Sequence, residues 1–96
     1  MIITGQEELP ASATFTLYPV PNNGLFTASI LYPVDDTFTI AVYNQLGVKL
    51  FEMADVKITG GKFATQIDLR PVSAGMYTVV FTNGEHKVVK KVIINK

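Results

Sequence analysis

The chain has 96 residues, 48% hydrophobic and 17% charged, with eight acidic side chains balancing eight basic ones. This profile predicts one globular domain with a modest core and excludes a disordered chain, and zero net charge argues against a dedicated nucleic-acid or membrane-surface binder. Without cysteine and with one histidine, the chain cannot form disulfides and is poorly supplied for zinc binding or catalysis.

The predicted elements are seven short β-strands, because β-branched residues are abundant and apolar side chains alternate with polar ones. In chain order, the expected strands are residues 14–18, 25–31, 37–43, 48–53, 62–69, 76–82 and 87–94. In the fourth strand, Val48 and Leu50 are expected to face the core. Residues 1–13 are small, polar and acidic and predict a linker or the tail of a preceding domain, which leaves residues 14–96 as the domain.

Glycine, proline and asparagine mark the turns between the strands. Asn83-Gly84 predicts a two-residue type I′ hairpin, because both positions tolerate a positive φ. The segment Asn44–Gly47 predicts a type I turn closed by a left-handed glycine. The segment Pro21–Gly24 predicts a turn in which proline presets φ and the glycine is left-handed.

The stretch from Leu69 to Tyr77 favours a sandwich over a closed barrel. A strand ends at Leu69, a short loop with proline, serine and glycine follows, and Tyr77 opens the next strand. This spacing is similar to the tyrosine corner of Greek-key sandwiches, in which a tyrosine hydroxyl bonds to the main chain a few residues upstream. The sequence therefore predicts an all-β fold, an Ig-like Greek-key β-sandwich of about seven antiparallel strands.

Candidate catalytic and metal-binding residues are few. Asp35-Asp36 offers the oxygen ligands that calcium accepts, but without EF-hand spacing, and His86 is expected on an exposed hairpin. We therefore predict no catalytic residues, no metal and no cofactor. The last ten residues contain Lys87, Lys90, Lys91 and Lys96. On chemistry alone, these lysines either protect an edge strand from aggregation or form a basic recognition surface.

Four segments, in this order, resemble the motifs of the C-terminal sorting domains of the type IX secretion system. They read FTLYPVPNNGLF in residues 15–26, VYNQLGVKLF in 42–51, IDL followed by SAGMY in 67–77, and KKVIINK in 90–96. The sequence departs from the family pattern at Val20, where the family usually has an asparagine that can cap the turn through its side chain. Pro19, Pro21 and Gly24 keep the backbone constraints of that turn.

The resemblance implies a non-catalytic export signal attached to a larger cargo protein. Such cargo reaches the periplasm through its own signal peptide and crosses the outer membrane to the cell surface or the medium. A sortase-like protease then commonly removes the sorting domain, here by a cut in or before residues 1–13. By the same resemblance, Gly47 and Gly75 hold turns. The secretion machinery is expected to recognise Lys90, Lys91, Val92, Ile93 and Lys96.

The alternative is an Ig- or fibronectin-like adhesive or spacer module that binds carbohydrate or protein. A sorting domain ends its parent chain, whereas a spacer can lie anywhere, and we expect the stop just after Val92–Ile94 to favour the sorting domain. Neither interpretation predicts a nucleic acid or a small-molecule substrate as partner. The free sheet edges of a sandwich also allow a strand-paired dimer.

Overall fold

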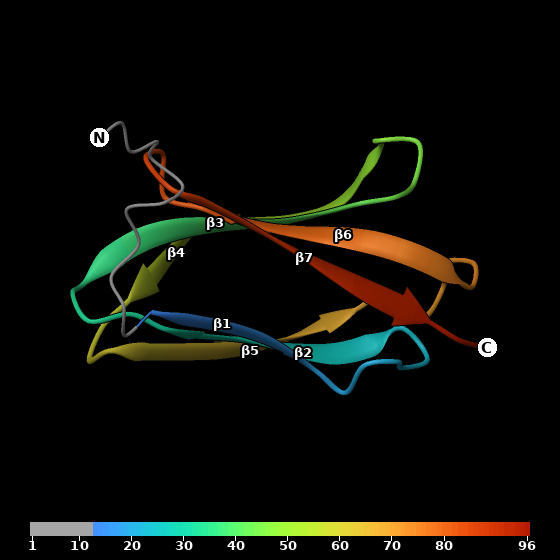
Figure 1. Ribbon diagram of the computed structural model, residues 1–96, viewed down its shortest axis with the longest axis horizontal. Helices are drawn as coiled ribbons and strands as arrows, with labels where there is room; N and C mark the ends of the chain where they lie inside the picture. Colours follow the sequence, from blue (N-terminus) through green and yellow to red (C-terminus); the bar gives the residue numbers. More distant parts are fainter. Residues whose placement is uncertain (1–12) are drawn as a thin grey trace, which may run out of the picture.

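Two antiparallel β-sheets lie face to face in the computed structural model, which describes residues 13–96 (Figure 1). One sheet has the order β1-β2-β5 and contains β1 (Thr14–Tyr18), β2 (Leu25–Leu31) and β5 (Lys62–Asp68). The other has the order β4-β3-β6-β7 and contains β3 (Asp36–Tyr43), β4 (Lys49–Ile58), β6 (Gly75–Thr82) and β7 (Lys87–Ile94). The predicted all-β sandwich of seven antiparallel strands is confirmed. The expected linker lies outside the described residues, except for Ala13.

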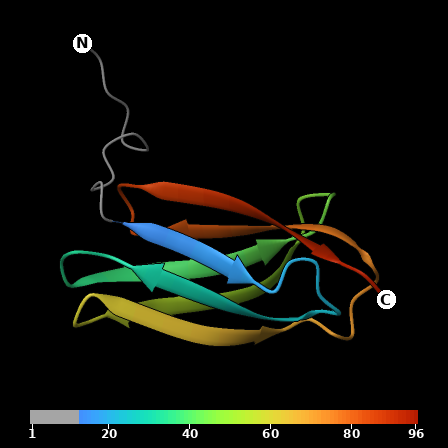
Figure 2. The ribbon, with the colours of Figure 1, turned by 60° about the horizontal axis from the view of Figure 1, so that its bottom comes forward.

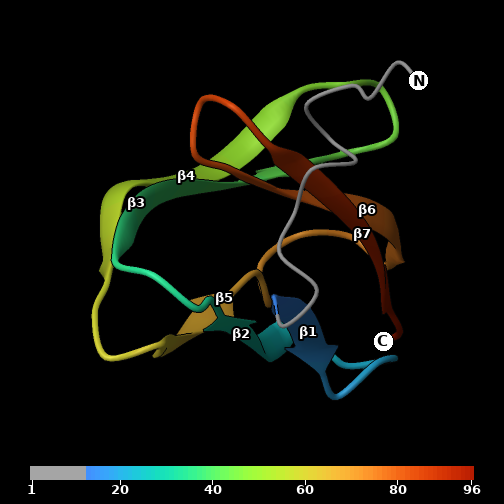
Figure 3. The same cartoon turned by 60° about the vertical axis from the view of Figure 1, so that its left-hand side comes forward.

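Three connections between consecutive strands are hairpins within one sheet and three cross between the sheets. The pairs β1–β2, β3–β4 and β6–β7 are neighbours within a sheet, whereas the chain changes sheet after β2, β4 and β5. Figures 2 and 3 show that β1 and β7, which are edge strands of different sheets, lie along the same side of the sandwich. No helix among residues 13–96 is long and apolar enough to cross a membrane.

The core lies between the sheets and is built from alternate positions of the strands. Its largest fully buried side chains are Phe26, Ile30, Phe38, Ile40, Val42, Ile58, Ile67, Val79, Phe81, Val92 and Ile94. Burial of each such side chain stabilises the fold by roughly 1.5–3 kcal/mol. Phe15 of β1 joins the two sheets, because its ring centroid lies 5.7 Å from that of Phe38 and 5.2 Å from that of Phe81.

Strand β4 differs from its prediction in both length and facing. It runs past residue 53 to Ile58, and Asp55 has a φ of 58° at an irregularity in its pairing with β3. Pairing with β3 places Phe51 on the core side, whereas Val48 is 53% exposed and Leu50 is 39% exposed. The inward prediction for Val48 and Leu50 is therefore wrong. A register shift opposite the end of β3 breaks the simple alternation there.

The loop between β6 and β7 is wider than the predicted two-residue hairpin. Thr82 pairs with Lys87, so the loop spans residues 83–86. The Asn83 side-chain Oδ1 accepts hydrogen bonds from the main-chain N–H of Glu85 and of His86, at 2.9 and 2.7 Å. This side chain closes a longer loop than a type I′ turn needs, and it leaves His86 half-buried instead of exposed.

Candidate functional site

The four segments that resemble sorting-domain motifs meet at one end of the sandwich, although they are distant in the sequence. The loop after β1, the β3–β4 hairpin, the corner before β6 and the end of β7 lie at the right-hand end of Figure 1. Antiparallel pairing explains this convergence, because β1, β3, β5 and β7 end where β2, β4 and β6 begin. We call this end, formed by residues 18–24, 44–47, 69–75 and 93–96, the motif end.

Asn22 organises the loop between β1 and β2. Its Nδ2 donates to the carbonyl oxygen of Pro19 at 2.8 Å, and its Oδ1 accepts from the N–H of Gly24 at 2.8 Å. The peptide bonds before Pro19 and Pro21 are both cis. Val20, which is 45% exposed, has no side-chain polar group to offer the turn. Asn22 therefore supplies side-chain capping in this turn, which Val20 cannot.

Gly24 lets this loop touch the corner between β5 and β6. The N–H of Leu69 donates to the carbonyl oxygen of Gly24 at 2.6 Å. A Cβ atom on Gly24 would lie 2.8 Å from main-chain atoms of Leu69 and Arg70, and the φ of Gly24 is +110°. Only glycine meets both conditions. The predicted positive φ at Gly24 is thus confirmed, and the loop and the corner form one packed unit.

Tyr77 holds the corner as the sequence predicts. Its hydroxyl donates to the carbonyl oxygen of Ser73 at 2.6 Å, and the side chain is only 7% exposed. Gly75 opens β6 beside this ring, where a Cβ atom would lie 3.8 Å from a Tyr77 ring carbon. The N–H of Val72 donates to the carbonyl oxygen of Leu69 at 3.1 Å. The corner is therefore closed from within by a main-chain bond and a side-chain bond.

The end of β7 is tied to the β1–β2 loop. The N–H of Asn22 donates to the carbonyl oxygen of Ile93 at 3.1 Å, and the N–H of Asn95 donates to the carbonyl oxygen of Asn22 at 2.7 Å. These bonds make a short parallel bridge between the loop and the strand end. A partner that binds the strand end therefore also meets the loop around Asn22.

Two basic side chains, Lys96 and Arg70, make hydrogen bonds on the exposed side of the corner. The Lys96 ammonium donates to the carbonyl oxygens of Arg70 and Val72. Arg70 donates through Nε and Nη2 to the Asp68 carboxylate, at 2.9 and 2.7 Å. These hydrogen bonds lower the pKa of Asp68 to about 2 and raise the pKa of Arg70. Both side chains are about half exposed, so the pair orients the corner more than it stabilises the fold.

The β3–β4 hairpin is shaped by Asn44. Its Oδ1 accepts from the N–H groups of Leu46 and Val48, at 2.9 and 3.0 Å. The N–H of Gly47 donates to the carbonyl oxygen of Asn44 at 3.0 Å, and Gly47 has a φ of +84°. These values confirm the predicted turn closed by a left-handed glycine. Leu46 at its tip is 87% exposed.

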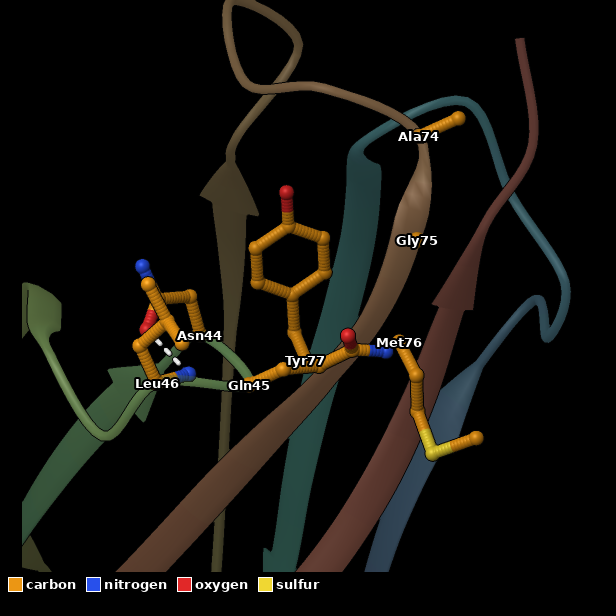
Figure 4. Close-up of a pocket in the computed structure, with 7 residues that line it drawn as sticks. All are labelled: Asn44, Gln45, Leu46, Ala74, Gly75, Met76 and Tyr77. Atoms are coloured by element: carbon orange, nitrogen blue, oxygen red, sulfur yellow. Dashed lines mark hydrogen bonds between the residues drawn. The ribbon is translucent and has the colours of Figure 1, made fainter.

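A shallow depression of about 210 Å³ separates this hairpin from the start of β6 (Figure 4). Its lining residues are Asn44, Gln45, Leu46, Ala74, Gly75, Met76 and Tyr77. In Figure 4 the Tyr77 ring stands between the hairpin and the corner, with its hydroxyl directed toward the loop before β6. Tyr77 is the one titratable residue among these seven, and its hydroxyl is engaged with Ser73. The depression suits binding by shape rather than acid–base chemistry.

The predicted recognition residues differ in how the fold presents them. Lys90, Lys91 and Ile93 are exposed on β7, whereas the Val92 side chain is fully buried in the core. Val92 therefore contributes packing, not surface, in the folded domain. Lys90 and Lys91 border a groove of about 370 Å³ between β7 and β1. The other lining residues of this groove are Phe15, Thr16, Leu17 and Val20.

Sequence reasoning missed the role of Asn22. Its place between proline and glycine predicts a turn, but nothing local indicates that its main chain will bond to Ile93 and Asn95. The useful signal is the pair of asparagines before Gly24, since asparagine side chains favour bonds to nearby main chain. The long-range bridge follows only from the fold.

The strand order and the interlocked loops define a Greek-key β-sandwich domain in which several loops meet at one end. The family model of the secretion system C-terminal sorting domain matches residues 16–95, a range that spans nearly all of the four motif segments. The chain therefore belongs to this family, and it is a non-catalytic signal for export across the outer membrane by the type IX secretion system to the cell surface or beyond. A comparison with curated proteins found no match.

Proposed function

We propose that the outer-membrane secretion machinery binds the folded sandwich through the exposed side chains of β7 and the adjoining motif end. Lys90, Lys91 and Ile93 supply exposed contacts, and Val92 anchors the strand that carries them. Lys96, bound to corner carbonyl oxygens, fixes the end of the strand. The observation that carries the proposal is the convergence of all four motif segments on one end, with β7 tied among them.

We further propose that a sortase-like protease removes the domain after transit through the periplasm. The cut falls in or before residues 1–13, and the cargo is then released or attached to the cell surface. The position of β1 supports this cut site, because β1, the first strand among residues 13–96, begins at Thr14. A cut before that residue leaves every strand and every motif-end contact of residues 14–96 in place.

The test is a secretion assay with the full 96-residue chain. The chain is fused to the C-terminus of a periplasm-directed fluorescent protein in a bacterium with a working type IX system. We expect fluorescence at the surface or in the medium for the natural sequence. The double variant Lys90→Glu/Lys91→Glu should retain most of its fluorescence in the periplasm, because it reverses the charge of the proposed contact surface.

A matched control separates charge in general from charge on β7. The double variant Lys57→Glu/Lys62→Glu makes the same charge change on exposed positions of β4 and β5. It should be exported like the natural sequence. Equal export of both double variants would overturn the proposed contact surface. Periplasmic retention of the natural fusion, with the domain folded, would instead favour the adhesive or spacer module.

A further inference from the structure

Strand β7 has a free main-chain edge over part of its length. The Asn22 bonds show that the carbonyl oxygen of Ile93 and the N–H of Asn95 face away from β6, and in an antiparallel strand the N–H and C=O of one residue point the same way. Because these groups alternate along a strand, those of Lys87, Val89 and Lys91 face the same way. Among residues 13–96, no main-chain hydrogen bond meets this edge before the Asn22 bridge. The free stretch is thus Lys87–Lys91, about 17 Å long.

Along this edge, the side chains on the outer face of the sheet alternate between basic and apolar. Val89 lies opposite Val80 of β6, which in turn lies opposite Ala41 of β3, so an apolar row ends at Val89. Val89 is 50% exposed. The two flanking rows end in the exposed side chains of Lys87 and Lys91. A strand added here meets lysine, valine and lysine in turn.

A second copy of this chain is a poor occupant of the edge. In a symmetric antiparallel pair centred on Val89, Lys87 of one copy lies opposite Lys91 of the other, and the same holds at the other end. Like charges that are directly opposite on neighbouring strands destabilise the pairing. The lysines that repel a second copy attract carboxylates at the same positions. The charge pattern therefore selects an acidic partner over a dimer through this edge.

We propose that the edge at Lys87–Lys91 accepts one extended segment of a partner protein that carries an acidic, an apolar and an acidic residue at alternate positions. The acidic residues lie opposite Lys87 and Lys91, and the apolar residue continues the row that ends at Val89. The alternate side chains face the groove beside β1, near Lys90 and Leu17. The proposal rests on the proposed function, for which it names the chemistry of the surface that binds β7.

The first experiment titrates the full chain with the peptide acetyl-Thr-Glu-Thr-Val-Thr-Glu-Thr-amide and follows main-chain amides by NMR. We expect shifts concentrated on β7 and slower hydrogen exchange at Lys87, Val89 and Lys91, because their N–H groups gain acceptors. A peptide with lysine in place of both glutamates should bind about tenfold more weakly. The double variant Lys87→Glu/Lys91→Glu should reverse this preference, whereas Lys57→Glu/Lys62→Glu should preserve it.

A pair of N-methylated peptides tests the main-chain bonds themselves. In one the valine amide is methylated, and in the other a neighbouring threonine amide. Only one of these two amides can face β7, so one peptide should lose binding and the other should keep it. No binding by the glutamate peptide, or equal loss with both methyl groups, would overturn strand addition. That result is distinct from failure of the proposed function, since export of Lys90→Glu/Lys91→Glu is measured separately.

Discussion

The two ends of the sandwich are held together in different ways. At the motif end, the loop at 18–24 bonds through its main chain to both the corner and the end of β7. At the opposite end, formed by the loops at 32–35, 59–61 and 83–86, one main-chain bond joins Tyr32 N–H to Gly61 at 2.9 Å. The other link there is a side-chain bond from Asn83 to Asp36 at 2.9 Å. The motif end is therefore the more interlocked of the two.

The two ends also differ in the direction in which the pKa of a titratable group is shifted. Asp68 at the motif end is hydrogen-bonded to Arg70, which lowers its pKa. At the opposite end, burial raises the pKa of the Tyr32 hydroxyl, and the nearby carboxylates of Asp36 and Glu85 raise it further. At the motif end, the Asp68–Arg70 pair adds side-chain hydrogen bonds to a corner that main-chain bonds already join to the neighbouring loop. The four motif segments thus coincide with the more interlocked end of the sandwich.

The largest expected difference between the two ends is the loss of stability when a loop glycine is replaced by alanine. Gly24→Ala places a Cβ atom 2.8 Å from main-chain atoms of the corner, at a φ of +110°. We expect it to lower the free energy of unfolding by about 3 kcal/mol, from overpacking and backbone strain together. Chemical denaturation of the purified chain measures this loss.

Gly84→Ala at the opposite end is the matched control. Gly84 has a φ of +94°, but a Cβ atom there would meet nothing within 4 Å. Only the backbone strain remains, so we expect a loss of about 1 kcal/mol. Equal losses for the two variants would show that the close approach at Gly24 does not make the motif end the more sensitive one.

Tyr77→Phe is expected to have the next largest effect. It removes the hydroxyl that donates to the Ser73 carbonyl oxygen at 2.6 Å and leaves that acceptor without its partner. The free energy of unfolding should fall by about 1.5 kcal/mol. Tyr18→Phe changes a tyrosine that is 47% exposed and should leave stability nearly unchanged. An unaltered denaturation midpoint for Tyr77→Phe would contradict a structural role for the tyrosine corner.

Two asparagine substitutions, one at each end, should cost similar stability but change hydrogen exchange at different sites. Asn22→Ala and Asn83→Ala each remove side-chain bonds from a loop, and each should cost about 1 kcal/mol of stability. Hydrogen exchange should separate them. Asn22→Ala should speed exchange of the Asn95 amide, whose acceptor is the Asn22 carbonyl oxygen, and Asn83→Ala should not. Similar exchange rates at Asn95 in the two variants would argue that the Asn22 side chain does not hold the bridge between the loop and the end of β7 in place.

Most of the fold could be predicted from the sequence because apolar and polar residues alternate within each strand. The bounds of β1 and β2 match, and the tyrosine corner follows from the spacing of Leu69 and Tyr77. The end of β4 and the facing of its first residues could not be predicted, since the irregularity at Asp55 and the shifted register depend on pairing with β3. Periodicity describes a strand in isolation, whereas a bulge is a property of two strands.

The motif segments of the site could also be predicted, but not their assembly. Turn chemistry indicated Gly24 and Gly47, and both have a positive φ. The contact of Gly24 with the corner and the bridge from Asn22 to β7 join segments from opposite ends of the chain. Such contacts are set by topology, which local sequence patterns leave open.

The smallest predicted effect concerns the pH dependence of the corner. The folded-state pKa of Asp68 is about 2, below its ordinary value of 3.8, because Arg70 donates hydrogen bonds to the carboxylate. A lowered pKa in the folded state means that the pair stabilises the protein above the ordinary pKa and loses this contribution as the pH falls toward 2. The unfolding free energy of the natural chain minus that of Asp68→Asn should therefore shrink between pH 5 and pH 2, over about three pH units. High salt should reduce the difference, since both side chains are exposed. A difference that stays constant with pH would mean that Arg70 fixes the corner without help from the Asp68 charge.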